Sequence, residues 1–405
     1  MSEPIAVEDL LGRVLETVRP LPDLPLPLME SVGLSLAEDV DAPIALPSFD
    51  NSAMDGYAVR AEDLADASAT SPLTLPVVGE IGAGRAAILA LSPGTAVKIM
   101  TGAPIPAGAD AVVPYEQTDR GVARVRVEAA VTAGQHVRRA GDDVEVGERV
   151  LDAGTVLGPR QIGLLAALGR VTVRTRPRPR VVVISTGSEL REPGSTLGPD
   201  SIYDGNSYLL AAAAREAGAV AYRVGVVPDD AHTFREALSD QLVRADLVVT
   251  SGGVSEGDYD VVKEALRGED GMWFGPVAMQ PGKPQGFGTV GEDGIPIFTL
   301  PGNPVSAYVS FQMFVLPAIR QMQGLTPQVR PVRRARLGAP IEGKAGRRRY
   351  VRAHVADGTA TPVGGHGSHL LGDLARSNAL VVVGEATARL AAGAEVDVLM
   401  LDEEF

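Results

Sequence analysis

Residues 246–260 read DLVVTSGGVSEGDYD. The apolar run at 247–249 predicts a buried strand, and Ser251, Gly252 and Gly253 follow it almost at once. A glycine pair after a strand lets the backbone turn sharply and point its N–H groups at a ligand. Three acids come next at alternate positions: Glu256, Asp258 and Asp260. Together these groups suit a phosphate with a divalent cation, although a surface turn with an acidic helix cap explains the same residues.

The pattern of strand, loop and helix continues on both sides of this stretch. Residues 180–322 alternate strand-like and helix-like segments, which is typical of a doubly wound, largely parallel α/β sheet. Ligands of such sheets bind beyond the carboxyl ends of the strands. Candidate groups follow the predicted strands and the helix after residue 260: Thr186, Gly187, Ser188 and Glu189; Asp229 and Asp230; Lys283 in QPGKPQGFG; and Pro301, Gly302 and Asn303. We therefore predict one site for a phosphorylated ligand and Mg²⁺, although ordinary turns and helix starts explain each group alone.

Several other classes of site lack their motif. No G-x-G-x-x-G follows a predicted strand, and neither a Walker A motif nor a G-x-S-x-G elbow occurs. The histidines show no metal-ligand spacing, and the absence of cysteine removes disulfides, thiolate zinc sites and cysteine nucleophiles. The pattern thus argues against a nicotinamide enzyme, a zinc hydrolase and a serine hydrolase.

Composition indicates a multidomain protein. The 405 residues are 45% hydrophobic, enough for two or three domains with cores of their own. The formal net charge of −14 opposes binding to nucleic acid or an anionic membrane, so an anionic substrate needs local basic groups or a metal. The N-terminus lacks the features of a signal peptide, and no apolar run approaches the ~20 residues of a membrane span. We expect a soluble cytoplasmic protein.

The chain outside the α/β segment combines helical and β patterns. Amphipathic or short helices are predicted at 7–18, 29–37 and 159–167, and the last is expected to rejoin the first two. Residues 73–146 show strands between glycines and prolines, so we expect an inserted β domain. Residues 332–405 predict a small barrel or sandwich.

The residues of three segments suit both a functional role and a purely structural one. Residues 46–60 carry polar side chains that suit either a functional loop or a hydrogen-bonded turn. At 135–143, Arg138 and Arg139 beside two aspartates favour a solvated salt-bridged turn. The basic, proline-rich residues 170–180 favour a stiff linker over a nucleic-acid patch.

The motifs PSFDNSAMDGYAVR, IMTGAPIP, STGSEL, IYDGNSYLL, TSGGVSEGDYD, PGKPQGFG and TLPGNPVSAY occur in this order. They resemble those of the MoeA (gephyrin E-domain) family, the molybdopterin molybdenumtransferases, over nearly the whole chain. The resemblance implies a discontinuous N-terminal helical domain at 1–45 and 147–177 and an inserted β domain at 46–146. It further implies an α/β molybdopterin-binding domain at 178–326, a C-terminal β domain at 327–405, and an elongated homodimer whose cleft both subunits share.

The implied activity is the last step of molybdenum cofactor synthesis. Adenylylated molybdopterin and molybdate are the substrates, Mg²⁺ is required, and AMP leaves. Either a molybdate oxygen or water is the nucleophile, without a covalent protein intermediate. Carried over by motif, the catalytic residues are Asp55, Thr101, Glu189, Asp229, Asp258 and Lys283, and the metal ligands are Glu189, Asp229, Asp258 and Asp260. The substrate-binding residues are Ser185, Thr186, Gly187, Ser251, Gly252, Gly253, Ser255, Pro301, Gly302, Asn303, Arg138 and Arg349.

One position departs from the pattern of the family. Many members carry a basic residue just before PGKP, where this chain has Gln280; Arg347, Arg348 and Arg349 are candidates to compensate. A molybdopterin adenylyltransferase, or another nucleotide-processing enzyme on the same α/β domain, is an alternative, but its family shows TGGTG where this chain reads SGGVS. A non-catalytic scaffold is a further alternative. The adenylyltransferase is also a candidate partner.

Overall fold

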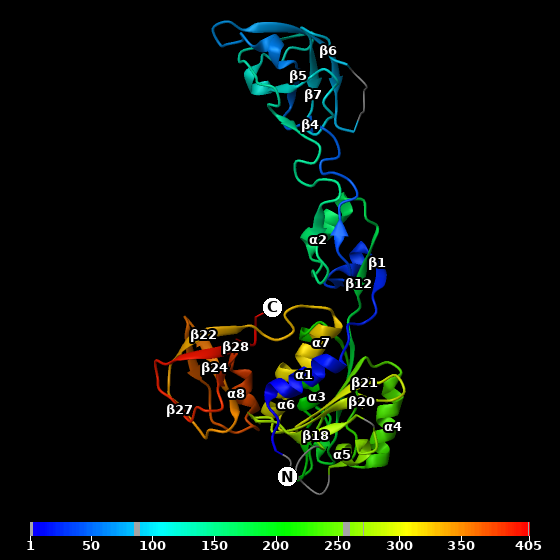
Figure 1. Cartoon of the computed structure of the whole chain (residues 1–405), viewed down its shortest axis with the longest axis vertical. Helices are drawn as coiled ribbons and strands as arrows, with labels where there is room; N and C mark the ends of the chain where they lie inside the picture. The colour runs from blue at the N-terminus through cyan, green and yellow to red at the C-terminus, as the bar shows by residue number, and fades with distance from the viewer. Residues whose placement is uncertain (1–2, 85–89, 254–259, 270, 404) are drawn as a thin grey trace. The chain divides into compact units, whose positions relative to one another are not determined.

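The computed structural model describes residues 3–84, 90–253, 260–269, 271–403 and 405 (Figure 1). The chain forms two compact units: Met1–Pro25 with Arg174–Phe405, and Leu26–Val173. The first unit holds the α/β part and the C-terminal strands. No helix of the described residues is both long and apolar enough to cross a membrane.

A six-stranded mixed sheet forms the centre of the α/β part, in the order β16-β13-β17-β21-β20-β18. The strands β13 (Arg180–Ser185), β16 (Val220–Arg223), β17 (Leu247–Ser251) and β21 (Ile295–Leu300) are parallel, as predicted. The strands β20 (Pro284–Val290) and β18 (Trp273–Pro276) run antiparallel to their neighbours. Because β20 is reversed, its first residues lie at the edge where the parallel strands end.

Helices cover both faces of this sheet, which explains why its strands are apolar throughout. Val181 and Val183 of β13 pack in one buried cluster, whereas Val182 and Ile184 pack in another. The first cluster includes residues of α3 (Asn206–Glu216), α6 (Pro304–Ser310), a π-helical turn (Phe311–Val315) and α7 (Leu316–Met322). The second includes residues of α4 (Ala231–Leu242) and α5 (Val261–Leu266). The predicted doubly wound architecture is confirmed.

The first helix packs in a different place from the one predicted. Helix α1 (Val7–Thr17) buries Val7, Leu10 and Val14, in agreement with the helical periodicity. These residues belong to the core of the α/β part, and residues 1–25 join the first unit. The amphipathic face of α1 predicted that the helix is buried but not against what. The predicted domain boundaries, that of the domain at 1–45 included, remain predictions.

The second unit contains a five-stranded sheet in the order β8-β5-β7-β6-β9. Its strands are β5 (Gly56–Val59), β6 (Leu73–Ile81), β7 (Ala96–Ile99), β8 (Ala111–Pro114) and β9 (Arg124–Val127), beside the pair β4 (Asn51–Ser52) and β10 (Val137–Arg138). Two 3₁₀ turns, Ala61–Leu64 and Tyr115–Gln117, accompany them. The strands predicted at 73–146 agree with β6, β7, β8 and β9, whereas β5 lies within residues 46–60, for which a loop or a turn was predicted.

The remainder of the second unit is less helical than predicted. Helix α2 (Pro159–Ala167) is present, but residues 29–37 form a 3₁₀ turn (Leu28–Ser31) and the short strand β2 (Ser35–Leu36). The other strands are β1 (Leu24–Pro27), β3 (Val40–Asp41), β11 (Arg149–Leu151) and β12 (Thr172–Arg176). Leu36, Leu157 and Leu165 form its small core, and such short apolar segments do not separate helix from strand by their pattern.

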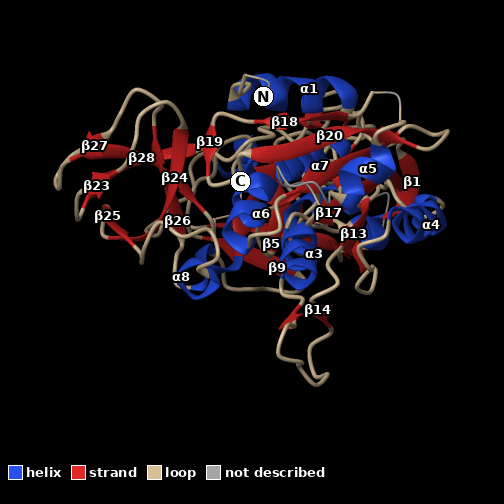
Figure 2. Ribbon diagram, turned by 90° about the horizontal axis from the view of Figure 1, so that it is seen from below, coloured by secondary structure: helices blue, strands red, loops and turns tan. Residues whose placement is uncertain are grey.

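The C-terminal strands close into a barrel (Figure 2). Its ring contains β24 (Arg348–Ala356), β25 (Thr359–Pro362), β22 (Val332–Leu337), β28 (Glu395–Met400) and β26 (Ala379–Val383), and β26 pairs back with β24. The short elements β23 (Ile341–Glu342), β27 (Arg389–Leu390) and α8 (Leu371–Ala375) lie beside it. Strand β19 (Met279–Gln280) pairs in parallel with β24 and joins the barrel to the α/β part.

Candidate active site

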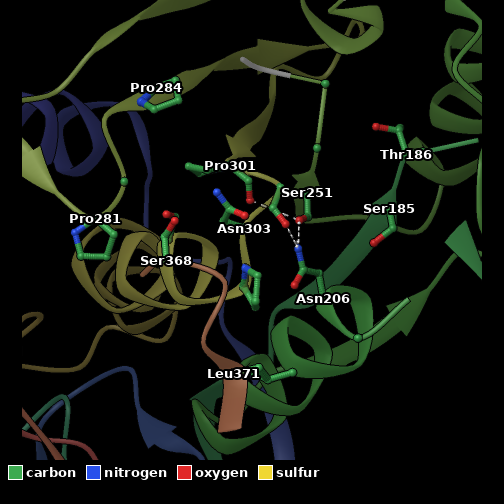
Figure 3. Close-up of a pocket in the computed structure, with 18 of the residues that line it drawn as sticks. Ser185, Thr186, Asn206, Ser251, Pro281, Pro284, Pro301, Asn303, Ser368 and Leu371 are labelled. Carbon is green, nitrogen blue, oxygen red and sulfur yellow. Dashed lines mark hydrogen bonds between the residues drawn. The ribbon is translucent and has the colours of Figure 1, made fainter. Parts of the chain in front are cut away.

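A cavity of about 670 Å³ lies at the carboxyl edge of the parallel strands (Figure 3). Most of the predicted site residues of the α/β part line it: Ser185, Thr186, Gly187, Glu189, Asp229, Ser251, Gly252, Gly253, Asp260, Lys283, Pro301, Gly302 and Asn303. They come from the loops that follow β13, β17 and β21, from the segment before α4, and from the segment that enters β20. The structure therefore brings together groups from positions up to about a hundred residues apart in the chain. Ser255, Glu256 and Asp258 lie outside the described residues.

Glycines allow two of these loops to approach each other closely. Gly252 has a φ of +97°, and a Cβ there would lie 2.7 Å from the carbonyl oxygen of Thr186. A Cβ on Gly302 would lie 3.6 Å from the Cα of Gly252. The N–H of Gly252 donates to the carbonyl of Leu300 at 3.1 Å. These two loops thus contribute glycine backbone to the wall of the cavity, which suits a phosphate.

Four acids line the same cavity: the predicted Glu189, Asp229 and Asp260, and also Asp204. The backbone N–H of Ser188 donates to Oδ2 of Asp229 at 2.9 Å, which holds that carboxylate in place. Within the described part of the chain, no three acidic or histidine side chains form a group that could by itself hold a metal ion. Mg²⁺ in phosphate-handling sites is commonly held by one or two carboxylates together with substrate phosphate oxygens, so the cavity still fits that ion.

Basic groups enter from two directions. Lys283 lines the cavity at the start of β20, and Arg347 and His366 line it from the C-terminal part. The loop of Lys283 is held by the buried Gln285, whose Nε2 donates to Gly282 O at 2.7 Å and to Ser310 Oγ at 2.5 Å. The backbone around Lys283 is therefore well supported.

Two of the three candidate arginines serve the structure and not the cavity. Arg349 was predicted to bind substrate, but its guanidinium is buried and donates to the carbonyls of Glu342, Thr387 and Ala388 at 2.9–3.3 Å. Arg348 pairs with Glu8 and Glu385. Arg347 is the member of this run that lines the main cavity, together with Gln280. Arg347 precedes β24, whereas Arg348 and Arg349 are its first two residues and point to opposite faces of the strand.

Three further predicted residues belong to the second unit. Asp55 Oδ1 accepts hydrogen bonds from the backbone N–H of Thr101 at 2.7 Å and from its hydroxyl at 2.8 Å. The bond from the backbone N–H of Thr101 lowers the pKa of Asp55 most, and the bond from the hydroxyl adds to it, so this pKa lies below its ordinary value. Arg138 lies exposed on β10, and Arg139 beside it pairs with Asp50 at 2.5 Å. The turn around Arg139 is therefore salt-bridged, as the residues alone suggested.

Replacing Thr101 with valine should raise the pKa of Asp55 toward its ordinary 3.8 but not fully, because the backbone N–H remains. A carboxylate that is more acidic when folded stabilises the fold above its unfolded pKa, and this contribution disappears as the pH falls through the folded pKa. Carbon-detected NMR titration of the carboxylates measures the shift. Thr95→Val is the control, because the Thr95 hydroxyl donates to Ser92 O instead. An unchanged Asp55 titration in Thr101→Val would contradict the assignment.

Sequence reasoning did not single out Asp204 and Asn206, although both line the cavity. Nδ2 of Asn206 donates to Ser251 Oγ at 2.8 Å and to Gly302 O at 2.6 Å. Their motif, IYDGN, begins with the exposed two-residue strand β15 (Ile202–Tyr203) and ends at Asn206, the first residue of α3. A strand that short gives no clear hydrophobic pattern, so the loop was not recognised as part of the sheet edge.

Comparisons with known proteins match every large part of the chain. Family models match residues 5–169 (MoeA N-terminal region, domain I and II), 182–321 ("Probable molybdopterin binding domain") and 334–401 (MoeA C-terminal region, domain IV). Molybdopterin molybdenumtransferase 2 of Mycobacterium tuberculosis is 48% identical over 394 residues, 95% of this chain and 96% of that protein. Transferase 1 of that organism is 41% identical over 421 residues, 98% of this chain and 99% of its own. A molybdopterin biosynthesis MoeA protein from Pyrococcus horikoshii has a TM-score of 0.88 at 32% identity, covering 99% of this chain and 100% of its own.

Proposed function

This chain belongs to the MoeA family of molybdopterin molybdenumtransferases, enzymes of molybdenum cofactor biosynthesis, and from this premise we propose that it inserts molybdate into adenylylated molybdopterin with Mg²⁺ and releases AMP. The observation that carries the proposal is one cavity that combines glycine-rich loops, four acidic side chains and a lysine. A ligand with phosphate groups and a metal requires this combination, and a purely organic ligand does not.

Each group of residues has a distinct part in this chemistry. Gly252 and Gly302 carry no side chain, so their loops leave room for the phosphate to approach the backbone closely. Lys283 neutralises an anionic oxygen of the phosphate or of molybdate as a point charge. Glu189, Asp229 and Asp260 would hold Mg²⁺, together with Asp258, which is assigned by the motif alone. Mg²⁺, when bound, supplies a Lewis acid for the phosphate ester.

The experiment that tests this function measures AMP release from adenylylated molybdopterin, with and without molybdate and Mg²⁺. Release that requires both supports the proposal, and no release under any of these conditions overturns it. Consumption of ATP with metal-free molybdopterin would instead assign an adenylyltransferase. Absence of binding to any molybdopterin species in calorimetry would point to a scaffold.

We further propose that the chain forms a homodimer in which Asp55, Thr101 and Arg138 of one subunit complete the cavity of the other. The support is chemical: Asp55 is held as a carboxylate by Thr101 at the protein surface, and the family resemblance gives these residues a place in the cleft. The molybdopterin adenylyltransferase is a candidate partner that would supply the substrate.

Mixing inactive Asp55→Ala and Lys283→Ala subunits tests the shared cleft. If the two residues come from different subunits, a mixed dimer has one cleft with both changes and one intact cleft. Random pairing should then restore about a quarter of the wild-type rate of AMP release. Each variant alone is the control, and sedimentation analysis checks that dimers form. No recovery in exchanged dimers would place both residues in one subunit.

A further inference from the structure

Asn206 connects two loops that form the cavity wall (Figure 3). It is the first residue of α3, and its single amide nitrogen donates to Ser251 Oγ at 2.8 Å and to Gly302 O at 2.6 Å. Ser251 ends β17, and Gly302 follows β21. Each of the two amide hydrogens can serve one acceptor, so this side chain bridges both loops at once.

The bridge joins two loops whose backbones lie close together. Gly252 follows Ser251 and approaches Gly302 so closely that a Cβ on Gly302 would lie 3.6 Å from its Cα. The hydroxyl of Ser251 also lies 3.4 Å from the carbonyl of Pro301 and can donate to it. The separation of the two loops therefore depends on a small number of polar contacts, of which those of Asn206 are the shortest.

A buried carboxylate holds Asn206 in turn. Asp204 is fully buried, and it accepts hydrogen bonds from Ser185 Oγ at 3.1 Å, from the N–H of Ser207 at 3.0 Å and from the hydroxyl of Ser207 at 2.5 Å. These bonds attach the first turn of α3 to the end of β13. A charge this deeply buried is costly unless it is compensated, and the three donors compensate it.

Arg223 completes the support from the neighbouring strand β16. Its Nη2 lies 3.8 Å from Oδ2 of Asp204, and its Nε donates to Ser207 Oγ at 2.8 Å. It also donates to the carboxylate of Glu192 at 3.1 and 3.2 Å. Ser207 consequently accepts from Arg223 and donates to Asp204, which gives the hydroxyl one defined orientation.

We propose that Asn206 is a positioning residue that sets the spacing of the Gly252 and Gly302 loops for the phosphate of adenylylated molybdopterin, and that Asp204 and Arg223 fix Asn206 through Ser207. This inference rests on the proposed function and names a determinant of pterin-substrate affinity that is separate from the metal ligands and from Lys283. It assigns the buried cluster a role in binding beyond its contribution to the fold.

The test compares steady-state AMP release by Asn206→Ala and wild type. Loss of both bridging hydrogen bonds should raise the KM for adenylylated molybdopterin about tenfold, while the KM for molybdate stays within about twofold. A loss of folded protein alone would lower kcat and leave both KM values unchanged. A rise in the KM for adenylylated molybdopterin alone therefore distinguishes a positioning role from an effect on stability.

Arg235→Ala is the matched control. Arg235 also donates two hydrogen bonds to backbone carbonyls of the same unit, those of Ala265 at 2.9 Å and Glu264 at 3.4 Å, and it does not line the cavity. We expect both of its KM values to match the wild type. A pterin-substrate KM that rises equally in both variants, or in neither, overturns the inference.

Ser207→Ala provides a second variant, at a residue that does not itself line the cavity. It interrupts the link from Arg223 to Asp204, and we expect the same KM to rise about threefold. An unchanged KM in Ser207→Ala, with Asn206→Ala unfolded, also overturns the inference. If the wild-type chain itself releases no AMP with molybdate and Mg²⁺, it is the proposed function that fails.

Discussion

Replacing Lys283 with alanine is expected to lower molybdate-dependent AMP release by about 10²–10³-fold, the loss typical of removing one charge-stabilising donor from an active site. The chain carries a formal charge of −14, and four acids line the cavity beside Lys283. An anionic substrate therefore depends strongly on the few basic groups present. Gln280, at the position before PGKP, adds no charge, which increases the weight of Lys283.

Two companion variants make this prediction specific. Lys283→Arg keeps the charge and should retain more activity than Lys283→Ala, although a guanidinium does not replace an ammonium fully. Arg347→Ala should have a smaller effect, because Arg347 is exposed to solvent, where charge interactions are screened. Single-turnover AMP release with saturating substrate measures all three. Equal activity of Lys283→Ala and wild type would show that Lys283 has no part in the mechanism.

Replacing Asp229 with asparagine is expected to reduce AMP release to a similar degree and to raise the Mg²⁺ concentration needed for half-maximal activity. The carboxamide oxygen can still accept the hydrogen bond from Ser188 N–H, so the loop keeps its shape while the charge is lost. A neutral ligand binds Mg²⁺ less tightly than a carboxylate. Titrating Mg²⁺ against activity measures the shift.

Asp230→Asn is the matched control for this charge removal. Asp230 is the next residue, does not line the cavity, and caps α4 by accepting from Thr233 N–H at 2.7 Å. Asparagine is an equally good cap, so both stability and Mg²⁺ dependence should match the wild type. If the Mg²⁺ dependence shifts equally in both variants, Asp229 does not hold the metal, and Glu189 with Asp260 become the stronger candidates.

Local patterns carried most of the information about the site. The run at 181–185, the glycine pair at 252–253 and the motif at 301–303 each predicted a strand end or a turn. The fold rule then placed them together, because parallel strands end at one edge of a sheet. The cavity contains these residues as predicted. The local pattern did not show why Lys283 lies there. Strand β20 runs antiparallel to β21, so the residues at its beginning lie at the edge where the parallel strands end.

The amino-acid sequence by itself was therefore sufficient for the α/β class, most of the inserted strands, the C-terminal strands and many of the residues around the cavity, because each depends on short-range periodicity or on the needs of a turn. Tertiary packing was required for three other results: the burial of α1 against the α/β part, the choice of Arg347 over Arg349, and the bridge made by Asn206. Each depends on contacts between residues distant in the chain. An amphipathic helix, an arginine run and a short polar loop do not identify their partners until the chain has folded.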